Sequence, residues 1–187
     1  MNRLTMIDKE RLLTVARQTI EAVTAGRRPG PFSSSSAVLT EKRGAFVTLH
    51  EGGELRGCIG YVRAIKPLLE TIVEMAEAAA LHDPRFQPVQ DGEAARLHIE
   101  ISVLSPMQLA DTPEQVQVGV HGVMVERDFH SGLLLPQVAP EQGWDREMLL
   151  THACLKAGLP GHAWRDSKTK IYLFTADVFG EADQVLP

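Results

Sequence analysis

The sequence predicts an α+β protein of two packed subdomains, with mainly antiparallel strands and with helices packed on the sheets. Two observations lead to this fold class. Strand-like segments alternate with segments of helical periodicity, and the order strand, strand, helix, strand occurs twice. The length of 187 residues, 44% of them hydrophobic and 23% charged, fits one domain with a substantial core. We therefore expect a single domain over residues 1–187, with a first unit at about 44–104 and a second at about 122–179.

An N-terminal helix is predicted over residues 5–26. Its apolar residues recur at helical spacing, and Gly26 provides the stop. These apolar residues are Leu13, Ala16, Ile20 and Val23. We expect this helix to pack on the core. The proline- and serine-rich loop that follows, residues 27–36, is long enough to be a flap or a linker.

The first unit begins with a hairpin of strands 45–49 and 54–60, joined by a turn that contains two glycines. A helix over about 66–82 follows, because its apolar residues form one stripe. The stripe consists of Leu68, Leu69, Ile72, Met75, Ala76 and Ala79. The helix should end before Pro84, since the residue that precedes a proline resists helical dihedral angles. A strand over 97–104 completes the unit.

The second unit repeats this order with strands at 123–126 and 133–138, a helix from Asp145 to Gly158 and a strand over 171–179. Three residue pairs stand 78 positions apart: Gly44 and Gly122, Leu55 and Leu133, and Gly60 and Val138. Residue identity between the halves is low, so the order of elements alone supports two duplicated β-β-α-β units.

Charge and cysteine content restrict the classes of partner. The formal net charge is −5 and no block of basic residues exists, so we expect no nucleic-acid binding. The segment 56–62 faintly resembles the strand motif of RNA-binding domains, but Cys58 stands where that motif needs an aromatic residue. The start of the chain does not resemble a signal peptide, and no apolar run reaches the roughly 20 residues that span a bilayer. Two cysteines 96 positions apart indicate free thiols, so we expect a cytosolic protein that does not act at a membrane.

The stretch Leu55–Gly60 carries the best candidate site. Side chains alternate across a strand, so Arg56 and Cys58 should share one face while Leu55 and Ile59 lie under the helix at 66–82. A cation beside a thiol favours the reactive thiolate. Two glycines within one strand suggest that backbone or a ligand comes close there.

Cys58 has two interpretations. It is either a small buried hydrophobic residue that lets two layers approach, or a functional thiol. A nucleophilic cysteine normally needs a base within hydrogen-bond reach. The histidines that could supply one are His50, His82, His98 and His121.

Arg56 and Glu100 are predicted on the same face of the sheet. Arg56 either pairs with Glu100 or clamps a carboxylate or phosphate of a substrate. Glu100, in the middle of an apolar strand, is a candidate general base or orienting carboxylate. His98 and Glu100 also have the strand spacing of two metal ligands, but no third ligand is identifiable, so we expect no metal.

Three further residues outside this strand carry interpretations. Arg85 is either a second substrate clamp or a cap on the last carbonyls of the preceding helix. Gln137 is polar within an apolar run, so it either orients a ligand or caps backbone. Cys154 lies inside a predicted helix, and we expect it in the core.

Five segments of the chain match the pattern of a known family, in order and over nearly the whole length. They are Leu55–Gly60, Asp83–Phe86, Ile99–Leu104, Gly132–Val138 and Cys154–Leu159. On these residues the chain resembles the AMMECR domain family, in bacteria called AmmeMemoRadiSam system protein A. The resemblance implies an α+β fold of two packed subdomains with a cleft near the core motif. It also implies association with a Memo-type protein, which resembles metal-dependent extradiol dioxygenases, and with a radical S-adenosylmethionine enzyme. It implies no established activity.

We therefore expect a cytosolic protein with a thiol-containing cleft that acts on or binds a small anionic molecule without a cofactor. Cys58 and Glu100 are the predicted catalytic residues. The predicted substrate-binding residues are Arg56, Gly57, Arg85 and Gln137. The alternative is a non-catalytic adaptor that docks the Memo-type or radical enzyme through the same motif.

Overall fold

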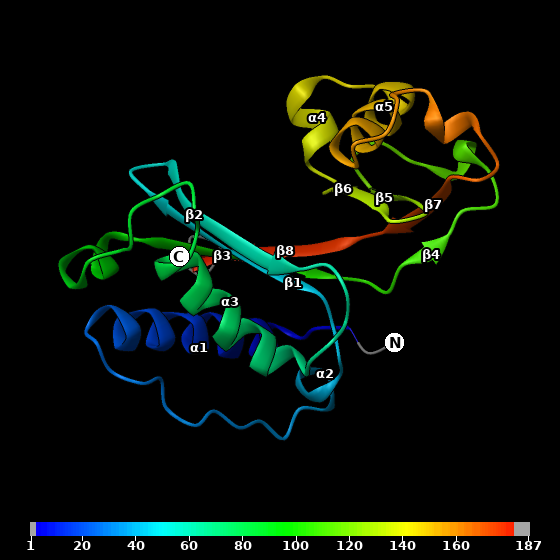
Figure 1. Ribbon diagram of the computed structural model, residues 1–187. Coiled ribbons are helices and arrows are strands. Elements are labelled where there is room, and N and C mark those ends of the chain that lie inside the picture. Colours follow the sequence, from blue (N-terminus) through cyan, green and yellow to red (C-terminus); the bar gives the residue numbers. More distant parts are fainter. Residues whose placement is uncertain (1–2, 182–187) are drawn as a thin grey trace. The chain divides into compact units, whose positions relative to one another are not determined.

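The computed structural model describes residues 3–181, which form two compact units. Of the described residues, 3–104 and 177–181 form unit 1, and Ser105–Ala176 form unit 2. Figure 1 shows the elements of both units. The α-helices and strands of unit 1 are α1 (Met6–Thr24), α2 (Ala37–Thr40), β1 (Ala45–Glu51), β2 (Glu54–Tyr61), α3 (Leu68–Leu81), β3 (His98–Leu104) and β8 (Ala176–Gly180). Strand β8 begins one residue before the boundary between the units. Those of unit 2 are β4 (Gln108–Leu109), β5 (Gly122–Arg127), β6 (His130–Leu134), α4 (Val138–Gln142), α5 (Arg146–Lys156) and β7 (Lys170–Phe174).

Each unit contains one four-stranded sheet, and three strands of each sheet are paired in the same way. The strand orders are β2-β1-β3-β8 and β4-β7-β5-β6. In each, the first hairpin strand pairs antiparallel with both the second hairpin strand and the strand after the helix. The predicted α+β fold, with antiparallel strands and helices packed on the sheets, is confirmed.

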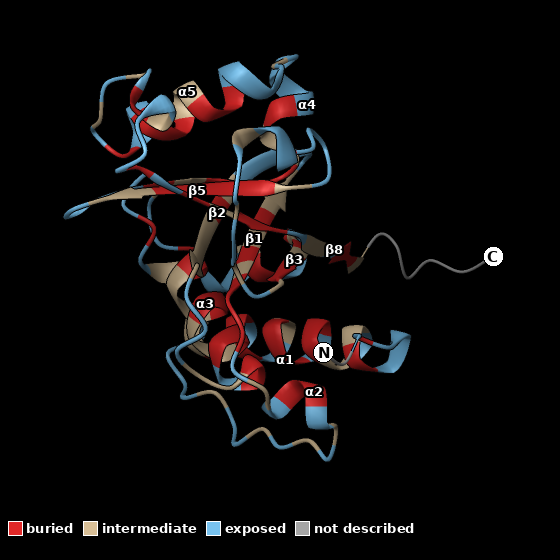
Figure 2. Ribbon diagram, turned by 90° about the vertical axis from the view of Figure 1, so that its right-hand side faces the viewer, coloured by how far each residue is buried: buried red, intermediate tan, exposed pale blue. Residues whose placement is uncertain are grey.

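Helices α1 and α3 cover one face of the unit 1 sheet (Figure 1). Figure 2 shows buried residues along both helices and along the strands. Alternate residues of the central strands, such as Val47, Leu49, Ile99 and Ile101, are fully buried in this core, and the other side chains of these strands face away from it. The start of α1 is fixed by a capping box, in which Thr5 and Asp8 satisfy each other's backbone N–H groups.

Two predicted strands of the second half have different bounds in the structure. The segment 171–179 is not one strand: β7 ends at Phe174, and β8 belongs to the other sheet. Alternation along a sequence cannot show that a chain passes from one sheet to another. The segment predicted as strand 133–138 ends at Leu134, which lies opposite Val123 of β5. Helix α4 begins at Val138 instead.

Short elements escaped prediction because they carry too few residues for a periodic pattern. They are α2, β4 and three 3₁₀ helices: η1 (Asp91–Arg96), η2 (Pro113–Gln115) and η3 (Ala163–Arg165). Among residues 3–181, no helix combines the length and the apolar character that crossing a membrane would require.

Candidate functional site

A β-bulge at Arg56 changes the expected faces of strand β2. Cys58 lies opposite Thr48 and Gly57 opposite Leu49, but the next residue of β1, His50, lies opposite Leu55. Arg56 is therefore the extra residue of the bulge, and it shifts the alternation by one position. Leu55 lies on the face of His50 and is 41% exposed, so the prediction that Leu55 packs with Ile59 under the helix is wrong.

Cys58, Thr48 and Glu100 form a row across the three strands β2, β1 and β3. Thr48 lies directly opposite both of the others, so all three side chains point to the face that α1 and α3 leave uncovered. Thr48 Oγ1 donates a hydrogen bond to Cys58 Sγ over 3.3 Å. The three side chains are half-buried.

Two further rows flank this one on the same face. Phe46 lies between Gly60 and Ser102, and its ring occupies the place where a Cβ of residue 60 would stand. On the other side, His50 lies opposite His98. The face thus joins a thiol, a hydroxyl, a carboxylate, an aromatic ring and two imidazoles. We call it the polar face of unit 1.

Gly57 lies on the opposite, helix-covered face. A Cβ at this position would collide with the backbone carbonyl oxygen of Ala79 in α3. The glycine is therefore required by the close approach of a helix, which is the backbone approach that the paired glycines indicated. This explains Gly57 without a ligand.

Arg56 does not form the ion pair with Glu100 that was one of its two interpretations. Strand β1 separates the two residues by roughly 10 Å, the width of two strand spacings. Arg56 Nε and Nη2 instead donate to the two carboxylate oxygens of Glu93 at 3.1 and 3.2 Å, and Nη1 donates to the Gln87 carbonyl at 2.9 Å. The backbone N–H of Gln90 and this guanidinium together hold the pKa of Glu93 below its usual value. Arg56 thus ties the segment 87–93 to the edge of the sheet.

Arg85 does not cap the preceding helix. Its Nε and Nη2 donate to the two oxygens of Asp83 at 3.0 and 2.7 Å, and Nη2 also donates to the carbonyl of Cys58 at 3.2 Å. These hydrogen bonds place the pKa of the Asp83 carboxyl far below its usual range. Asp83 raises the pKa of Arg85 in turn, and the nearby Cys58 side chain acts in the same direction. A guanidinium therefore lies beside the thiol, but it comes from Arg85 and not from Arg56.

The carboxylate of Glu100 has no hydrogen-bond or ion-pair partner within residues 3–181. A half-buried carboxylate without a partner is available to a ligand or to a proton. No histidine of this part of the chain bonds to Cys58; His121, for example, accepts a hydrogen bond from the Gln117 N–H in unit 2. The structure therefore brings Cys58 together with Thr48 and Arg85 rather than with an imidazole.

Gln137 belongs to unit 2. It precedes α4 but its side chain makes no cap there, which contradicts the backbone-capping interpretation. Its Oε1 is buried and has no hydrogen-bond partner among residues 3–181. Cys154 is fully buried in the core of unit 2, as predicted, and burial raises the pKa of its thiol.

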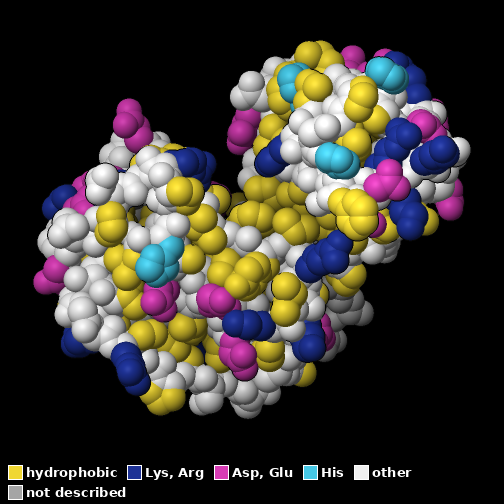
Figure 3. Space-filling model, viewed as in Figure 1, with side chains coloured by type: hydrophobic (Ala, Val, Ile, Leu, Met, Phe, Trp, Pro, Cys, Tyr) yellow, Lys and Arg dark blue, Asp and Glu magenta, His cyan; other side chains and the backbone are white. Residues whose placement is uncertain are grey.

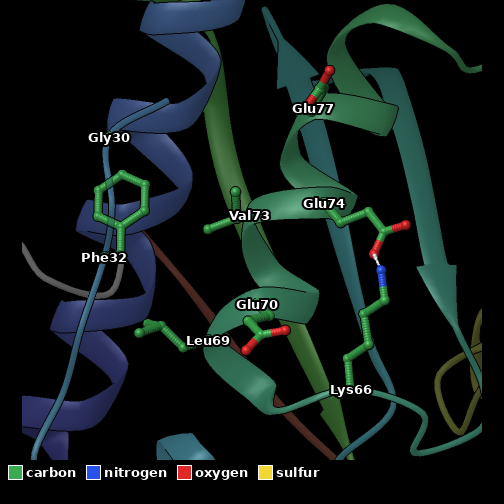
Figure 4. Close-up of a pocket in the computed structure, with 8 residues that line it drawn as sticks. All are labelled: Gly30, Phe32, Lys66, Leu69, Glu70, Val73, Glu74 and Glu77. Carbon is green, nitrogen blue, oxygen red and sulfur yellow. Dashed lines mark hydrogen bonds and ion pairs between the residues drawn. The ribbon is translucent and has the colours of Figure 1, made fainter. Parts of the chain in front are cut away.

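A separate groove of about 400 Å³ lies between α3 and the loop that contains Gly30 and Phe32 (Figure 4). Phe32, Leu69 and Val73 form its apolar wall. Carboxylates of α3 line it as well, and the one at Glu74 is occupied: Lys66 and Tyr61 each donate to it at 2.6 Å and hold its pKa low. Of the buried polar side-chain atoms without a partner in the described part of the chain, none belongs to a residue that lines this groove.

Unit 2 provides an internal comparison for the polar face of unit 1. Gly132 of β6 lies against the backbone of Ala153 in α5 in the way that Gly57 lies against Ala79. The residue after this glycine is Leu133, which lies opposite Met124, and Met124 lies opposite Tyr172. The row that contains Cys58 in unit 1 is thus leucine, methionine and tyrosine in unit 2. The thiol and the carboxylate are not needed to build this arrangement of strands and helix.

Sequence reasoning missed three residues of the site: Thr48, Asp83 and Glu93. Thr48 lies opposite Cys58 only because of the bulge at Arg56, so the predicted hairpin could not show this pairing. Asp83 lay within a recognised motif, but a hydrogen bond to a residue 25 positions away leaves no local pattern.

On the face of the molecule shown in Figure 3, acidic and basic side chains are intermixed.

Comparisons with known proteins agree with this fold. A family model named AMMECR1 matches residues 13–179. A protein of Methanothermobacter thermautotrophicus is 44% identical over 180 residues, which cover 91% of this chain and 92% of the relative. A protein of Methanopyrus kandleri is 44% identical over 190 residues, covering 97% and 92% of the two chains. The crystal structure of an uncharacterised protein from Pyrococcus horikoshii has a TM-score of 0.84 at 42% identity, covering 91% of this chain and 89% of that one. The chain belongs to the AMMECR1 family.

Proposed function

We propose that the polar face of unit 1 is a thiol-containing site that binds or acts on a small anionic molecule. Cys58 serves as nucleophile or as acid and base, Glu100 orients the molecule or removes a proton, and Arg85 holds its negative charge. Arg56 supports the site indirectly, because its guanidinium is occupied by Glu93 and Gln87. In unit 2, Gln137 is a separate proposed ligand-orienting residue, supported by its buried Oε1, which has no hydrogen-bond partner among the described residues.

The observation that carries this proposal is the in-register row of Cys58, Thr48 and Glu100. The corresponding row of unit 2 is Leu133, Met124 and Tyr172, although that unit has the same strand pairing and the same helix contact. Because unit 2 forms the same arrangement without a polar row, the polar row of unit 1 is most simply explained by a role in binding or catalysis. Both cysteines are free thiols, which supports a cytosolic location.

Complementation of a deletion strain tests the proposal. Small-molecule profiles are compared between the strain without the gene and strains that carry the wild type, Cys58→Ser, Glu100→Gln or the control Cys154→Ala. We expect the wild type and Cys154→Ala to restore the profile, and Cys58→Ser and Glu100→Gln to fail while they keep near-native melting temperatures. Full restoration by both site variants would refute the proposal.

A second candidate function, an adaptor for a Memo-type protein or a radical S-adenosylmethionine enzyme, is favoured by one observation. Leu55, the first residue of the motif, is 41% exposed beside His50 instead of packing in the core. An adaptor that uses this surface should lose its purified partner with Leu55→Asp and keep it with Cys58→Ser. If a binding titration shows that Leu55→Asp keeps the partner and Cys58→Ser loses it, the thiol site is favoured.

A further inference from the structure

The carboxylate of Asp83 is the most heavily bonded polar group near Cys58. Only 2% of its side chain is exposed. Its two oxygens accept four hydrogen bonds: from the N–H of Cys58 at 2.8 Å, from the N–H of Arg85 at 3.1 Å, and from the Nε and Nη2 of Arg85 at 3.0 and 2.7 Å. A buried charge of this kind depends on its partners, because an unpaired one is very costly.

These bonds occur at the open edge of the sheet. Strand β2 is an edge strand, and its residue Cys58 directs its N–H to Asp83 and its C=O to Arg85. The Asp83–Arg85 pair thus takes the place of a neighbouring strand at this one residue. The position of the guanidinium is thereby fixed to the backbone of the thiol residue itself.

The bidentate pair also decides which part of Arg85 is available to a ligand. Nε and Nη2 are engaged, whereas Nη1 has no hydrogen-bond partner among the residues that the structure describes. The side chain of Arg85 is 53% exposed although its partner is buried. One oriented edge with two N–H donors is therefore open to an anion.

From this geometry we infer that Asp83 is a positioning residue that makes the site selective for anionic substrates, by fixing the free Nη1 edge of Arg85 beside the Cys58 thiol. This inference rests on the proposed function and adds its determinant of substrate charge. Asp83 itself contacts no substrate; it acts through Arg85. The ligand class is a small molecule with a carboxylate or a similar planar oxyanion next to the atom that approaches the thiol.

Alkylation of Cys58 by two reagents of opposite charge type tests the inference. The sulfur attacks the methylene carbon of iodoacetate, an anion, or of iodoacetamide, which is neutral; a C–S bond forms and iodide leaves. Peptide mapping gives the rate at Cys58 alone, and each rate is divided by that of the urea-unfolded chain. We expect the iodoacetate-to-iodoacetamide ratio to exceed one in the wild type and to decline with added salt.

Variants separate positioning from charge. Arg85→Gln should lower this ratio roughly three- to tenfold, as expected for loss of one partly screened charge contact. Asp83→Asn should lower it by a similar factor although the arginine is still present, and the double variant should be no lower than either single one. Arg85→Lys keeps the charge but loses the fork, so it should also lower the ratio even if Asp83→Asn folds poorly. Glu51→Gln, which removes a carboxylate from the surface pair with Arg96, is the matched control and should change nothing.

Three results would overturn the inference. The ratio could stay at the wild-type value in Asp83→Asn, the rates with both reagents could decline equally, or the two substitutions could lower the ratio additively. Failure of the proposed function looks different, because Cys58 would then resist both reagents in the wild type itself.

Discussion

At the scale of single residues, one extra residue in β2 decides which side chains meet. The bulge at Arg56 places Leu55 opposite His50 and directs Arg56 to Glu93. Cys58 keeps its place opposite Thr48, whose hydroxyl donates to its sulfur. The thiol that the sequence singled out is therefore part of a polar face, and the guanidinium beside it is supplied by Arg85.

The two cysteines should differ in reactivity. Cys154 is fully buried and burial raises the pKa of its thiol, whereas Cys58 is half-buried next to a cation. We expect iodoacetamide to modify Cys58 at least about tenfold faster than Cys154 in the folded protein, as measured by peptide mapping over time. Modification of Cys154 first, or of neither residue before unfolding, would return Cys58 to a packing role.

Arg56 should hold the segment 87–93 at the edge of the sheet through its hydrogen bonds to Gln87 and Glu93. Arg56→Lys keeps the charge but cannot form the bidentate pair with Glu93, so amide hydrogen exchange should accelerate in residues 87–96. The alkylation rate of Cys58 should change less than twofold, because its contacts to Thr48 and Asp83 are kept. A large loss of thiol reactivity with unchanged exchange would instead assign Arg56 to the site.

At the scale of elements, a glycine in the second hairpin strand lets a helix lie directly on the sheet in both units. Gly57 lies against Ala79 of α3, and Gly132 lies against Ala153 of α5. We propose on this basis, and on the shared strand order, that the two β-β-α-β units arose by duplication. When the two units are superposed by their strand pairing, Leu49 of unit 1 corresponds to Val125 of unit 2, and Gly57 corresponds to Gly132. The equivalent residues are therefore defined by their helix contacts and not by a constant sequence offset.

Alanine at either glycine should destabilise the protein. In both Gly57→Ala and Gly132→Ala the new methyl group meets backbone atoms of a helix, and forced overpacking costs about 1–3 kcal/mol. Gly92→Ala is the control, because its Cβ would meet nothing within 4 Å. Denaturant unfolding measures all three, and equal midpoints for Gly57→Ala and the wild type would contradict the packing argument.

At the scale of the whole molecule, the acid-sensitive groups are concentrated in unit 1. The carboxyls of Glu74, Asp83 and Glu93 have pKa values lowered by the hydrogen bonds described above. A carboxyl with a lowered pKa binds its proton more readily in the unfolded chain. Its contribution is therefore complete above the unfolded pKa and is lost as the pH falls toward the folded value. In unit 2 the lowered groups, Glu114 and Asp166, are exposed and contribute little.

Acid unfolding should therefore begin in unit 1. The ordinary pKa values of 3.8 and 4.5 place the onset below about pH 5. Both tryptophans, Trp144 and Trp164, lie in unit 2, so their fluorescence reports that unit while far-UV circular dichroism reports both. We expect the dichroism to change at higher pH than the fluorescence. Coincident curves, or fluorescence that changes first, would contradict this assignment.

The sequence alone determined the fold class, the two hairpins, the three longest helices α1, α3 and α5, and the position of the thiol. Local patterns carry this information: a period of 3.6 in the stripe from Leu68 to Ala79, alternation in 97–104, and a helix that starts at Asp145, where the structure has the N-cap of α5. Cys58 and Glu100 were recognised because alternation assigns them to the strand face opposite the apolar one.

Tertiary structure alone decided what these residues contact. A one-residue bulge, the passage of the chain from β7 into β8 of the other sheet, and the pairing of Asp83 with the backbone of Cys58 are set by long-range contacts. Side-chain periodicity indicates which face of an element is apolar. It does not indicate which distant polar group forms hydrogen bonds with the backbone of an edge strand. For that reason the sequence identified the thiol and the structure identified its cation.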